Sequence, residues 1–266
     1  MTKKYELTEN TKMIGGAKLR QIRALRDFDT VRTGDLGGWI EKEKNLSHGG
    51  TAWVVGNARV VSDARVDGNA RVVGNARVGG DARVDGDARV DGNARVVGNA
   101  RVDGNARVDG SARVGGDALI RGNARVDGNA RVDGDAWVVG NAWVGGNARV
   151  DGNARVVGNA RVVGDARVGG NARVVGDARV CGGVWDKSPL YIQGTRWAFN
   201  VASDTQIRVG CQLHTWEEWH GRFREIAAEH NAKDVLREYV EYFNLACRLY
   251  GHEGCLIELG GESDVS

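Results

Sequence analysis

Apolar and polar positions alternate with a fixed period of six residues through the middle of the chain. From Gly50 to Cys181 the sequence consists of 22 units close to the form Gly-(Asn/Asp)-Ala-Arg-Val-x. Valine occupies every sixth position from residue 54 to residue 180, and Ile120 is its only replacement. The units follow one another without an insertion, so we expect each of them to form the same local structure.

This period fits short strands and does not fit helices. A helix, with about 3.6 residues per turn, would spread the valines over all its sides, whereas a strand over Ala-Arg-Val-x places alanine and valine on one side. Valine favours strands, and glycine followed by Asn or Asp favours tight corners. A strand this short cannot bury its apolar side alone, so the units must coil and stack on one another. The repeat therefore predicts a mainly β protein built on a parallel β-solenoid.

The repeat resembles that of the hexapeptide-repeat left-handed β-helix proteins. In that family an aliphatic residue recurs at every sixth position and a small residue follows it four places later. Val60 with Ala64 and Val66 with Ala70 match the pattern, which covers about half of the chain. The resemblance implies three units per triangular coil, about seven coils for the 22 units, and a left-handed coil.

The segments that flank the repeat resemble a narrower group. Residues 19–28, 34–41 and 45–47 are similar to the N-terminal part of the YdcK-like hexapeptide-repeat proteins of bacteria, prophages and phages. Residues 207–219 are similar to the tail of many phage members. The resemblance therefore implies a YdcK-like protein of the phage or prophage type. Those relatives have no established activity, so it implies a fold and a source and no reaction.

The flanks are predicted to cap the two open ends of the solenoid, where unpaired strands would otherwise stack on another molecule. We expect four segments: an N-terminal β cap over 1–49, the β-helix over 50–183, a β-segment over 184–213 and a C-terminal helical cap or tail over 214–266.

Two helices are expected in the C-terminal cap. The sequence Thr215-Trp216-Glu217-Glu218 has the form of a capping box, and apolar residues follow it at helical spacing. A second helix is predicted to open at Asn231 and to end at Gly251.

Charge and composition narrow the class of protein. The formal net charge is +2, and residues 1–48, 49–180 and 181–266 contribute +3, +4 and −5. The four cysteines all lie in the last third, which does not suit a secreted disulfide framework and indicates reduced thiols. No stretch reaches the roughly 18 apolar residues of a membrane span, and the N-terminus lacks the apolar core of a signal peptide. We expect the protein in the cytoplasm, the host's if a phage encodes it, without membrane contact.

The repeat lacks the residues of the enzymes that share its pattern. Hexapeptide acyltransferases resemble one another in using a histidine beside the prism, and the γ-carbonic anhydrases use three histidines to hold zinc. No histidine lies between Gly50 and Cys181. The repeat has a single threonine, which argues against ice binding, and Asn is about as frequent as Asp at its corners, which argues against calcium. We therefore expect no catalytic residue, no cofactor and no enzyme. The only cluster that could carry a reaction is His214 with Glu217 and Glu218.

The outward positions of the repeat form charged columns when the units are sorted by coil. One face carries an unbroken row of arginines: Arg59, Arg77, Arg95, Arg113, Arg131, Arg149 and Arg167. The first four are candidates for binding an anion, because their outward neighbours are uncharged: Val61, Gly79, Val97 and Gly115. The alternative is a solvated row without a ligand. Aromatic residues are not interleaved with it, which argues against nucleic acid.

On the other two faces arginine and aspartate alternate. We expect exposed ion pairs that contribute little energy each. The predicted pairs are Arg65/Asp67, Arg83/Asp85 and Arg101/Asp103 on one face, and Arg89/Asp91, Arg107/Asp109 and Arg125/Asp127 on the other.

A further set of outward positions is apolar. Tryptophan or leucine replaces arginine at a few of them, and outward valines lie close by. Together they predict a patch for a partner or for self-association: Leu119, Trp137, Val139, Trp143, Val157, Val163 and Val175. Three alternatives are open. The C-terminal helices fold back over the patch, copies of the chain join through it as a dimer or trimer, or a host or phage protein binds it.

The C-terminal cysteines and histidines are weak candidates for a zinc site: Cys211, His214, Cys247, His252 and Cys255. Their spacing matches no standard zinc finger, and buried free cysteines are common. We expect no metal there.

The leading functional hypothesis is a non-catalytic phage or prophage accessory protein, a rigid binding or scaffold module for a macromolecular partner. Inhibition of a host defence protein is a specific form of it. The alternative is a sponge-like binder that holds an anionic small molecule or nucleotide in grooves between subunits. An acyltransferase-like enzyme is the third reading. Fold alone does not decide among them.

Overall fold

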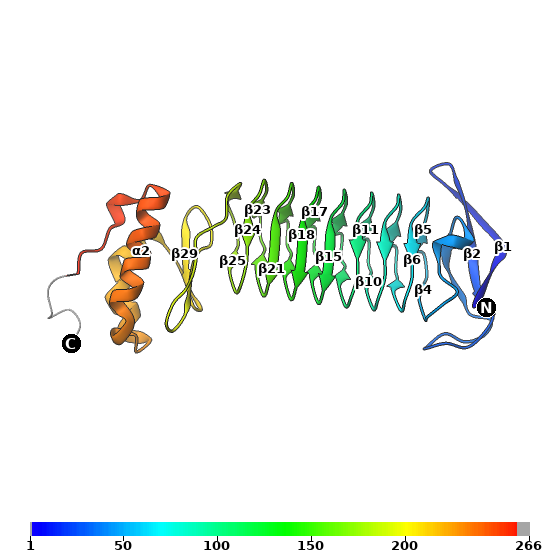
Figure 1. Ribbon diagram of the computed structural model, residues 1–266, viewed down its shortest axis with the longest axis horizontal. Coiled ribbons are helices and arrows are strands. Elements are labelled where there is room, and N and C mark those ends of the chain that lie inside the picture. The colour runs from blue at the N-terminus through cyan, green and yellow to red at the C-terminus, as the bar shows by residue number, and fades with distance from the viewer. Residues whose placement is uncertain (1, 260–266) are drawn as a thin grey trace.

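The computed structural model describes residues 2–259. The molecule is an elongated β-solenoid with a β cap at its N-terminal end and a small sheet and two helices at its C-terminal end (Figure 1). Met1 and residues 260–266, the last part of the predicted segment 214–266, lie outside the described residues. Within residues 2–259, no helix is long and apolar enough to cross a membrane.

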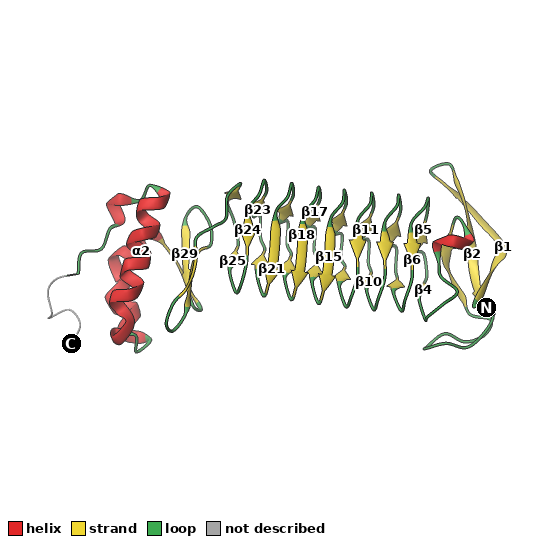
Figure 2. Ribbon diagram, in the orientation of Figure 1, coloured by secondary structure: helices red, strands yellow, loops and turns green. Residues whose placement is uncertain are grey.

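Each six-residue unit forms a short strand whose arginine lies outward and whose valine lies inward. Strands 18 residues apart pair in parallel, so that Arg59 lies beside Arg77 and Val60 beside Val78. Three units therefore complete one turn, and the turns stack along the molecule (Figure 2). This confirms the predicted parallel β-solenoid with three units per coil. Its left hand stays a prediction from the resemblance.

The stacked strands form three faces. Face 1 consists of β5 (Arg59–Val60), β8 (Arg77–Val78), β11 (Arg95–Val96), β14 (Arg113–Val114), β17 (Arg131–Val132), β20 (Arg149–Val150) and β23 (Arg167–Val168). Face 2 consists of β6 (Arg65–Val66), β9 (Arg83–Val84), β12 (Arg101–Val102), β15 (Leu119–Gly122), β18 (Trp137–Gly140), β21 (Arg155–Gly158) and β24 (Arg173–Val174). Face 3 consists of β4 (Trp53–Val54), β7 (Arg71–Val72), β10 (Arg89–Val90), β13 (Arg107–Val108), β16 (Arg125–Val126), β19 (Trp143–Val144), β22 (Arg161–Val162) and β25 (Arg179–Val180).

The solenoid has about eight turns, one more than the predicted seven. The additional strands come from the flanks. β3 (Leu36–Ile40) pairs in parallel with β5, Leu46 bridges Val66, and β26 (Val184–Trp185) pairs in parallel with β23. The stack thus begins and ends in segments that do not carry the six-residue pattern, which a count of units misses.

The core is a column of valine and alanine. The inward valines from Val54 to Val180, and Ile120 in the place of one of them, are at most 1% exposed, and the inward alanines are equally buried. Full burial of a valine side chain contributes roughly 1.5–3 kcal/mol. Every turn repeats this contribution, so the solenoid is stabilised evenly along its length.

Glycine and asparagine form the corners. Gly110 has a φ of 65°, in the left-handed region that glycine tolerates. Asparagines beside the glycines form amide ladders: Nδ2 of Asn123 donates to Oδ1 of Asn141 at 2.9 Å, and Nδ2 of Asn141 donates to Oδ1 of Asn159 at 3.0 Å. This confirms that the Gly-Asn steps are corners whose side chains bond to one another.

The N-terminal cap covers the open edge of the first turn. β1 (Tyr5–Ile14) and β2 (Ala17–Ala24) form an antiparallel hairpin, β2 pairs with β3, and the 3-10 turn η1 (Glu43–Asn45) follows. Lys4 and Tyr5 are buried beneath it. Nζ of Lys4 donates to the carbonyl of Ala52 at 2.8 Å, and the Tyr5 hydroxyl donates to the carbonyl of Leu46 at 2.8 Å. These bonds satisfy acceptors that a bare solenoid end would leave open.

The C-terminal unit follows β26. It contains an antiparallel sheet of β27 (Tyr191–Gln193), β28 (Ala198–Val201), β29 (Gln206–Val209) and β30 (Gln212–Thr215), and then α1 (Trp216–Glu229), η2 (Lys233–Val235), α2 (Leu236–Tyr250) and η3 (Glu253–Cys255). Asn200 donates through Nδ2 to the carbonyl of Arg179 at 2.8 Å, and the N–H of Cys181 donates to the carbonyl of Ala202 at 2.9 Å. The sheet thus closes the last turn.

The capping box of α1 is present as predicted. The N–H of Glu218 donates to Oγ1 of Thr215 at 3.1 Å, and the Glu218 carboxylate accepts the N–H of Thr215 at 2.9 Å. The predicted start of the second helix is wrong. Asn231 has a φ of 50° and follows the end of α1, and α2 begins only at Leu236. A left-handed asparagine is typical of a helix C-terminus. Gly251 ends α2 with a φ of 75°, as expected.

Candidate functional site

The apolar patch predicted on the repeat divides between two neighbouring faces. Five of its residues lie on face 2: Leu119, Trp137, Val139, Val157 and Val175. The other two, Trp143 and Val163, lie on face 3. We call the five residues of face 2 the face-2 patch.

Parallel pairing makes the face-2 patch continuous. Leu119 pairs with Trp137, and Val139 pairs with Val157. Trp137 is 41% exposed and Val175 is 40% exposed, and the other three side chains are half-buried. The patch therefore presents an aromatic ring and a column of valines on a solenoid whose outward positions are mostly arginine and aspartate.

The Trp137 ring is held from one side. The guanidinium of Arg155, in the next turn, lies 4.5 Å from the ring centroid. A cation–π contact at an exposed site contributes about 0.5–1 kcal/mol. The contact orients the ring and leaves part of it open to solvent.

Trp143 is placed differently. Its ring folds over Gly145, where an added Cβ would lie 2.7 Å from Nε1 of Trp143. Nε1 is buried and, among the described residues, has no hydrogen-bond partner. Trp143 is therefore half-buried against its own turn, and Trp137 provides the accessible aromatic surface of the patch.

The C-terminal helices do not cover the patch. α1 and α2 lie beyond the last turn and pack on β28, β29 and β30 (Figure 1). The alternative in which these helices fold back along the solenoid is therefore wrong. Self-association and a foreign partner stay open.

The predicted arginine row is the outward column of face 1. Its members pair in register from Arg59 to Arg167. All except Arg59 are exposed. Among residues 2–259, no carboxylate lies within ion-pair distance of any of the seven. Within the described residues the arginine column of face 1 thus has no ion pair, and from Arg59 to Arg113 it also has no aspartate at the second outward position.

Ion pairs do occur on the other faces, though not all as predicted. Arg89 pairs with Asp91 at 2.8 Å and Arg125 pairs with Asp127 at 2.7 Å, as expected. Asp103 instead contacts Arg121 at 3.2 Å, and Asp109 contacts Arg125 at 3.6 Å, each one turn further along. For Arg65/Asp67 and Arg83/Asp85, no ion pair forms within the described residues. Long arginine side chains reach along the stack as easily as along their own strand, which the sequence pattern does not reveal.

The surroundings of these carboxyls change their pKa values. The backbone N–H of Gly92 and the Arg89 guanidinium lower the pKa of Asp91, against the effect of burial. Burial raises the pKa of Asp109 and outweighs the opposing effect of Arg125.

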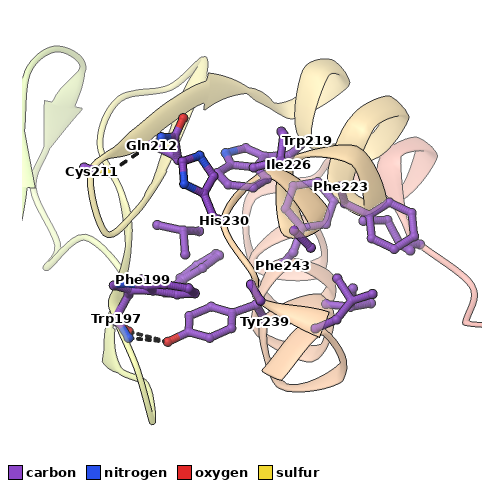
Figure 3. A pocket seen from close by; sticks show the side chains of 16 residues that line it. Trp197, Phe199, Cys211, Gln212, Trp219, Phe223, Ile226, His230, Tyr239 and Phe243 are labelled. Carbon is purple, nitrogen blue, oxygen red and sulfur yellow. Dashed lines mark hydrogen bonds between the residues drawn. The ribbon is translucent and has the colours of Figure 1, made fainter. Parts of the chain in front are cut away.

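A cavity lies in the C-terminal unit, between the antiparallel sheet and the two helices (Figure 3). Its volume is about 130 Å³. Aromatic rings form most of its wall: Trp197, Phe199, Trp219, Phe223, Tyr239 and Phe243. Cys211, Gln212 and His230 add polar groups.

Comparison with known families agrees with this architecture. The family model described as YdcK Beta solenoid repeat matches residues 166–182, which contain β23, β24 and β25. This match and the β-solenoid architecture together fit a YdcK-like repeat protein. A search of curated proteins finds no match.

The five Cys and His candidates do not form one site within the described residues. His252 stacks on Trp216 with 4.0 Å between ring centroids, and His214 lies edge-on to Trp219. Cys247 is buried, which raises the pKa of its thiol to about 12, and Cys211 is exposed. Within residues 2–259, no group of three or more His, Cys, Asp or Glu side chains is arranged to hold a metal ion.

Of the predicted cluster of His214, Glu217 and Glu218, the structure brings His214 and Glu218 together. The carboxylate of Glu218 accepts the capping bond of α1, and Nδ1 of His214 lies 3.7 Å from it. Nε2 of His214 lies 3.2 Å from the side-chain oxygen of Gln212. These contacts hold the His214 side chain at the junction of β30 and α1.

The cavity was missed by sequence reasoning. The apolar spacing of the two helices identifies Trp219, Phe223 and Phe243 as inward residues, and the structure places them there. Inward rings can fill the space between a helix pair and a sheet or leave part of it empty. The outcome depends on packing angles, which the spacing of apolar residues does not give.

Proposed function

We propose that this YdcK-like protein is a non-catalytic binding or scaffold module, and that the face-2 patch holds a macromolecular partner. The observation that carries the proposal is the exposure of Trp137 at a position where 18 of the 22 repeat units carry arginine, together with the exposed Val175 on the same face. Exposed apolar surface is costly in water and commonly marks an interface. A tryptophan flanked by arginine is also a composition that dominates binding energy at interfaces.

The scaffold suits this role because it is rigid and regular. Its repeat units share a core of valine and alanine, with Ile120 as the one replacement of valine, and the solenoid is capped at both ends, so the patch is displayed on a fixed surface. Self-association as a dimer or trimer through face 2 is the simplest use of such a surface, because every copy carries the same patch.

A phage or prophage origin, implied by the flanking segments, gives the proposal a specific form. In that setting a binding module acts by occupying its partner, and a host defence protein is the foreign partner class we propose. The protein then works in the host cell as an inhibitor by binding.

Photo-crosslinking tests the proposal. A photoreactive phenylalanine analogue is placed at position 175, and in a matched control at position 97 on face 1, where Val97 is 37% exposed. Position 175 should give one discrete protein adduct in infected or expressing cells, and Trp137→Arg should abolish it. Equal labelling from both positions, or none from position 175, would contradict the proposal.

A second candidate function rests on face 1. Its seven arginines lack carboxylate partners within the described part of the chain, and like charges one strand apart repel unless an anion or solvent lies between them. An anionic small molecule or nucleotide held between subunits would satisfy them. The purified protein should then absorb at 260 nm, and Arg95→Gln with Arg113→Gln should remove that absorbance. A protein free of absorbing ligand after purification at low salt would argue against this function.

A further inference from the structure

We infer that the cavity of the C-terminal unit is a binding site for a small uncharged aromatic molecule that carries one hydrogen-bonding group. This inference goes beyond the proposed function. It uses neither face 2 nor face 1, so it stands or fails separately from both.

The size of the cavity sets the size of the ligand. Its volume of about 130 Å³ is close to that of engineered apolar cavities of about 150 Å³, which stay dry and bind benzene. The cavity therefore accommodates a single six-membered ring with a small substituent. Larger fused ring systems would require the helices to move.

The wall disfavours a charged ligand, because two of its polar side chains already bond to backbone carbonyls and it offers no charged partner. Nε1 of Trp219 donates to the carbonyl of Ile207 at 3.0 Å, and the Tyr239 hydroxyl donates to the carbonyl of Trp197 at 2.8 Å. The described lining residues include no Asp, Glu, Lys or Arg. A charged group placed among these rings would lose its hydration without gaining a partner.

Of the glutamine and the histidine in the lining, the histidine is left for a ligand. The side-chain oxygen of Gln212 already faces His214, and its amide nitrogen donates to the sulfur of Cys211 at 3.6 Å. The backbone N–H of His230 bonds to the carbonyl of Ile226 at 3.2 Å, whereas its ring has no hydrogen-bond partner in the described residues. Figure 3 places His230 beside Trp219 and across the cavity from Tyr239. A hydroxyl on the ligand would thus meet His230 while its ring contacts the aromatic wall.

A titration of the full-length protein with 4-methylphenol at pH 7 tests the inference, followed by the fluorescence of the tryptophans and by the midpoint of thermal unfolding. We expect saturable binding of one molecule per chain and a rise in the unfolding midpoint, because the ligand binds the folded state. Benzoate, of similar size but charged, should bind at least about ten-fold more weakly. The absence of saturable binding of 4-methylphenol would overturn the inference.

Two neighbouring alanines of α1 provide a matched pair of variants. Ala227 lines the cavity and is buried, whereas Ala228 is exposed. Ala227→Leu fills the space and should weaken 4-methylphenol about ten-fold or more, and Ala228→Leu should leave its affinity unchanged. Equal affinity of the two variants would place the ligand elsewhere and overturn the inference.

His230→Ala provides a test that does not depend on repacking, since this side chain is exposed. It should weaken 4-methylphenol several-fold and leave the binding of toluene, which lacks the hydroxyl, unchanged. If both ligands respond alike, His230 does not receive the polar group and that part of the inference is wrong. Trp137→Arg should retain 4-methylphenol binding whatever it does to protein association.

Discussion

At the scale of single residues, the corner glycines show how closely the turns approach one another. Gly128 has a φ of 63°, and a Cβ built there would lie 2.9 Å from the carbonyl oxygen of Gly146 in the next turn. Real Cβ atoms do not approach backbone oxygen that closely, so a side chain at this corner would push two turns apart. Glycine therefore recurs at the corners for two reasons: the corner needs a positive φ, and the stacked turns leave no room for a Cβ atom.

We predict that Gly128→Ala lowers the free energy of unfolding by about 2 kcal/mol, from the left-handed conformation and the clash together. Gly221→Ala is the control. Gly221 lies in α1 with no atom within 4 Å of a built Cβ, so alanine there should be neutral or stabilising by up to about 1 kcal/mol. Urea unfolding of both variants checks this, and a loss of stability confined to the Gly221 variant would contradict it.

Lys4 is a second residue with a measurable consequence. It is fully buried, and its burial, with the charge of Arg26 against the weaker opposing effect of Asp67, lowers its pKa from 10.5 to about 8. Between those two values the unfolded chain holds a proton that the folded chain has lost, so stability rises with pH over that interval. Below about pH 8 both states are protonated and this contribution does not change with pH.

We therefore expect wild type to gain about 1–2 kcal/mol of unfolding free energy relative to Lys4→Met between pH 7.5 and pH 9.5. The difference between the two proteins removes contributions from other titrating groups, such as the buried Cys247 thiol. Urea unfolding at the two pH values measures it. A difference that is the same at both pH values would show that Lys4 titrates normally.

At the scale of elements, the repeat determines far more than the flanks do. Valine at every sixth position and alanine four places after it predict each strand, its inward side and its partner 18 residues away. The start of α2 was misplaced because Asn231 suits both a helix start and a left-handed helix end, and the contacts of α1 select the second. The extra turn was missed because Leu36–Ile40 pairs with β5 through its backbone, without the six-residue pattern.

The candidate site was predictable only in part, for a similar reason. In the sequence, Trp137 and Trp143 stand out equally, because both replace the arginine of the repeat. Only the structure shows that Gly145 lets the Trp143 ring fold onto its own turn while Trp137 stays open. The cavity depends on the angle between helices and sheet, and no residue spacing encodes it.

The capping box of α1 gives a prediction at this scale. Thr215→Ala removes the acceptor of the Glu218 N–H and should lower the stability of the C-terminal unit by about 1 kcal/mol. Thr215→Ser keeps the hydroxyl and should stay within a few tenths of a kcal/mol of wild type. The midpoint of helix loss by circular dichroism measures this. Equal behaviour of the two variants would assign the loss to the methyl group and not to the cap.

At the scale of the whole molecule, the three faces differ in chemistry while sharing one backbone. Among the described residues, face 1 carries an arginine column without ion pairs, part of faces 2 and 3 is occupied by ion pairs, and the C-terminal half of face 2 carries the face-2 patch beside Arg155 and Arg173. A capped solenoid with such distinct faces can associate through one of them without blocking the others. We assign the association of copies of the chain to face 2.

The most direct test of that assignment is the mass of the protein in solution by light scattering. Wild type is compared with Trp137→Arg plus Val139→Asp, which restores the Arg-Val-Asp form of the repeat, and with Val97→Asp, which makes the same valine-to-aspartate change on face 1. We predict a dimer or trimer for wild type and for Val97→Asp, and a folded monomer for the face-2 double variant. The same mass for wild type and the double variant would contradict the claim that face 2 joins copies of the chain.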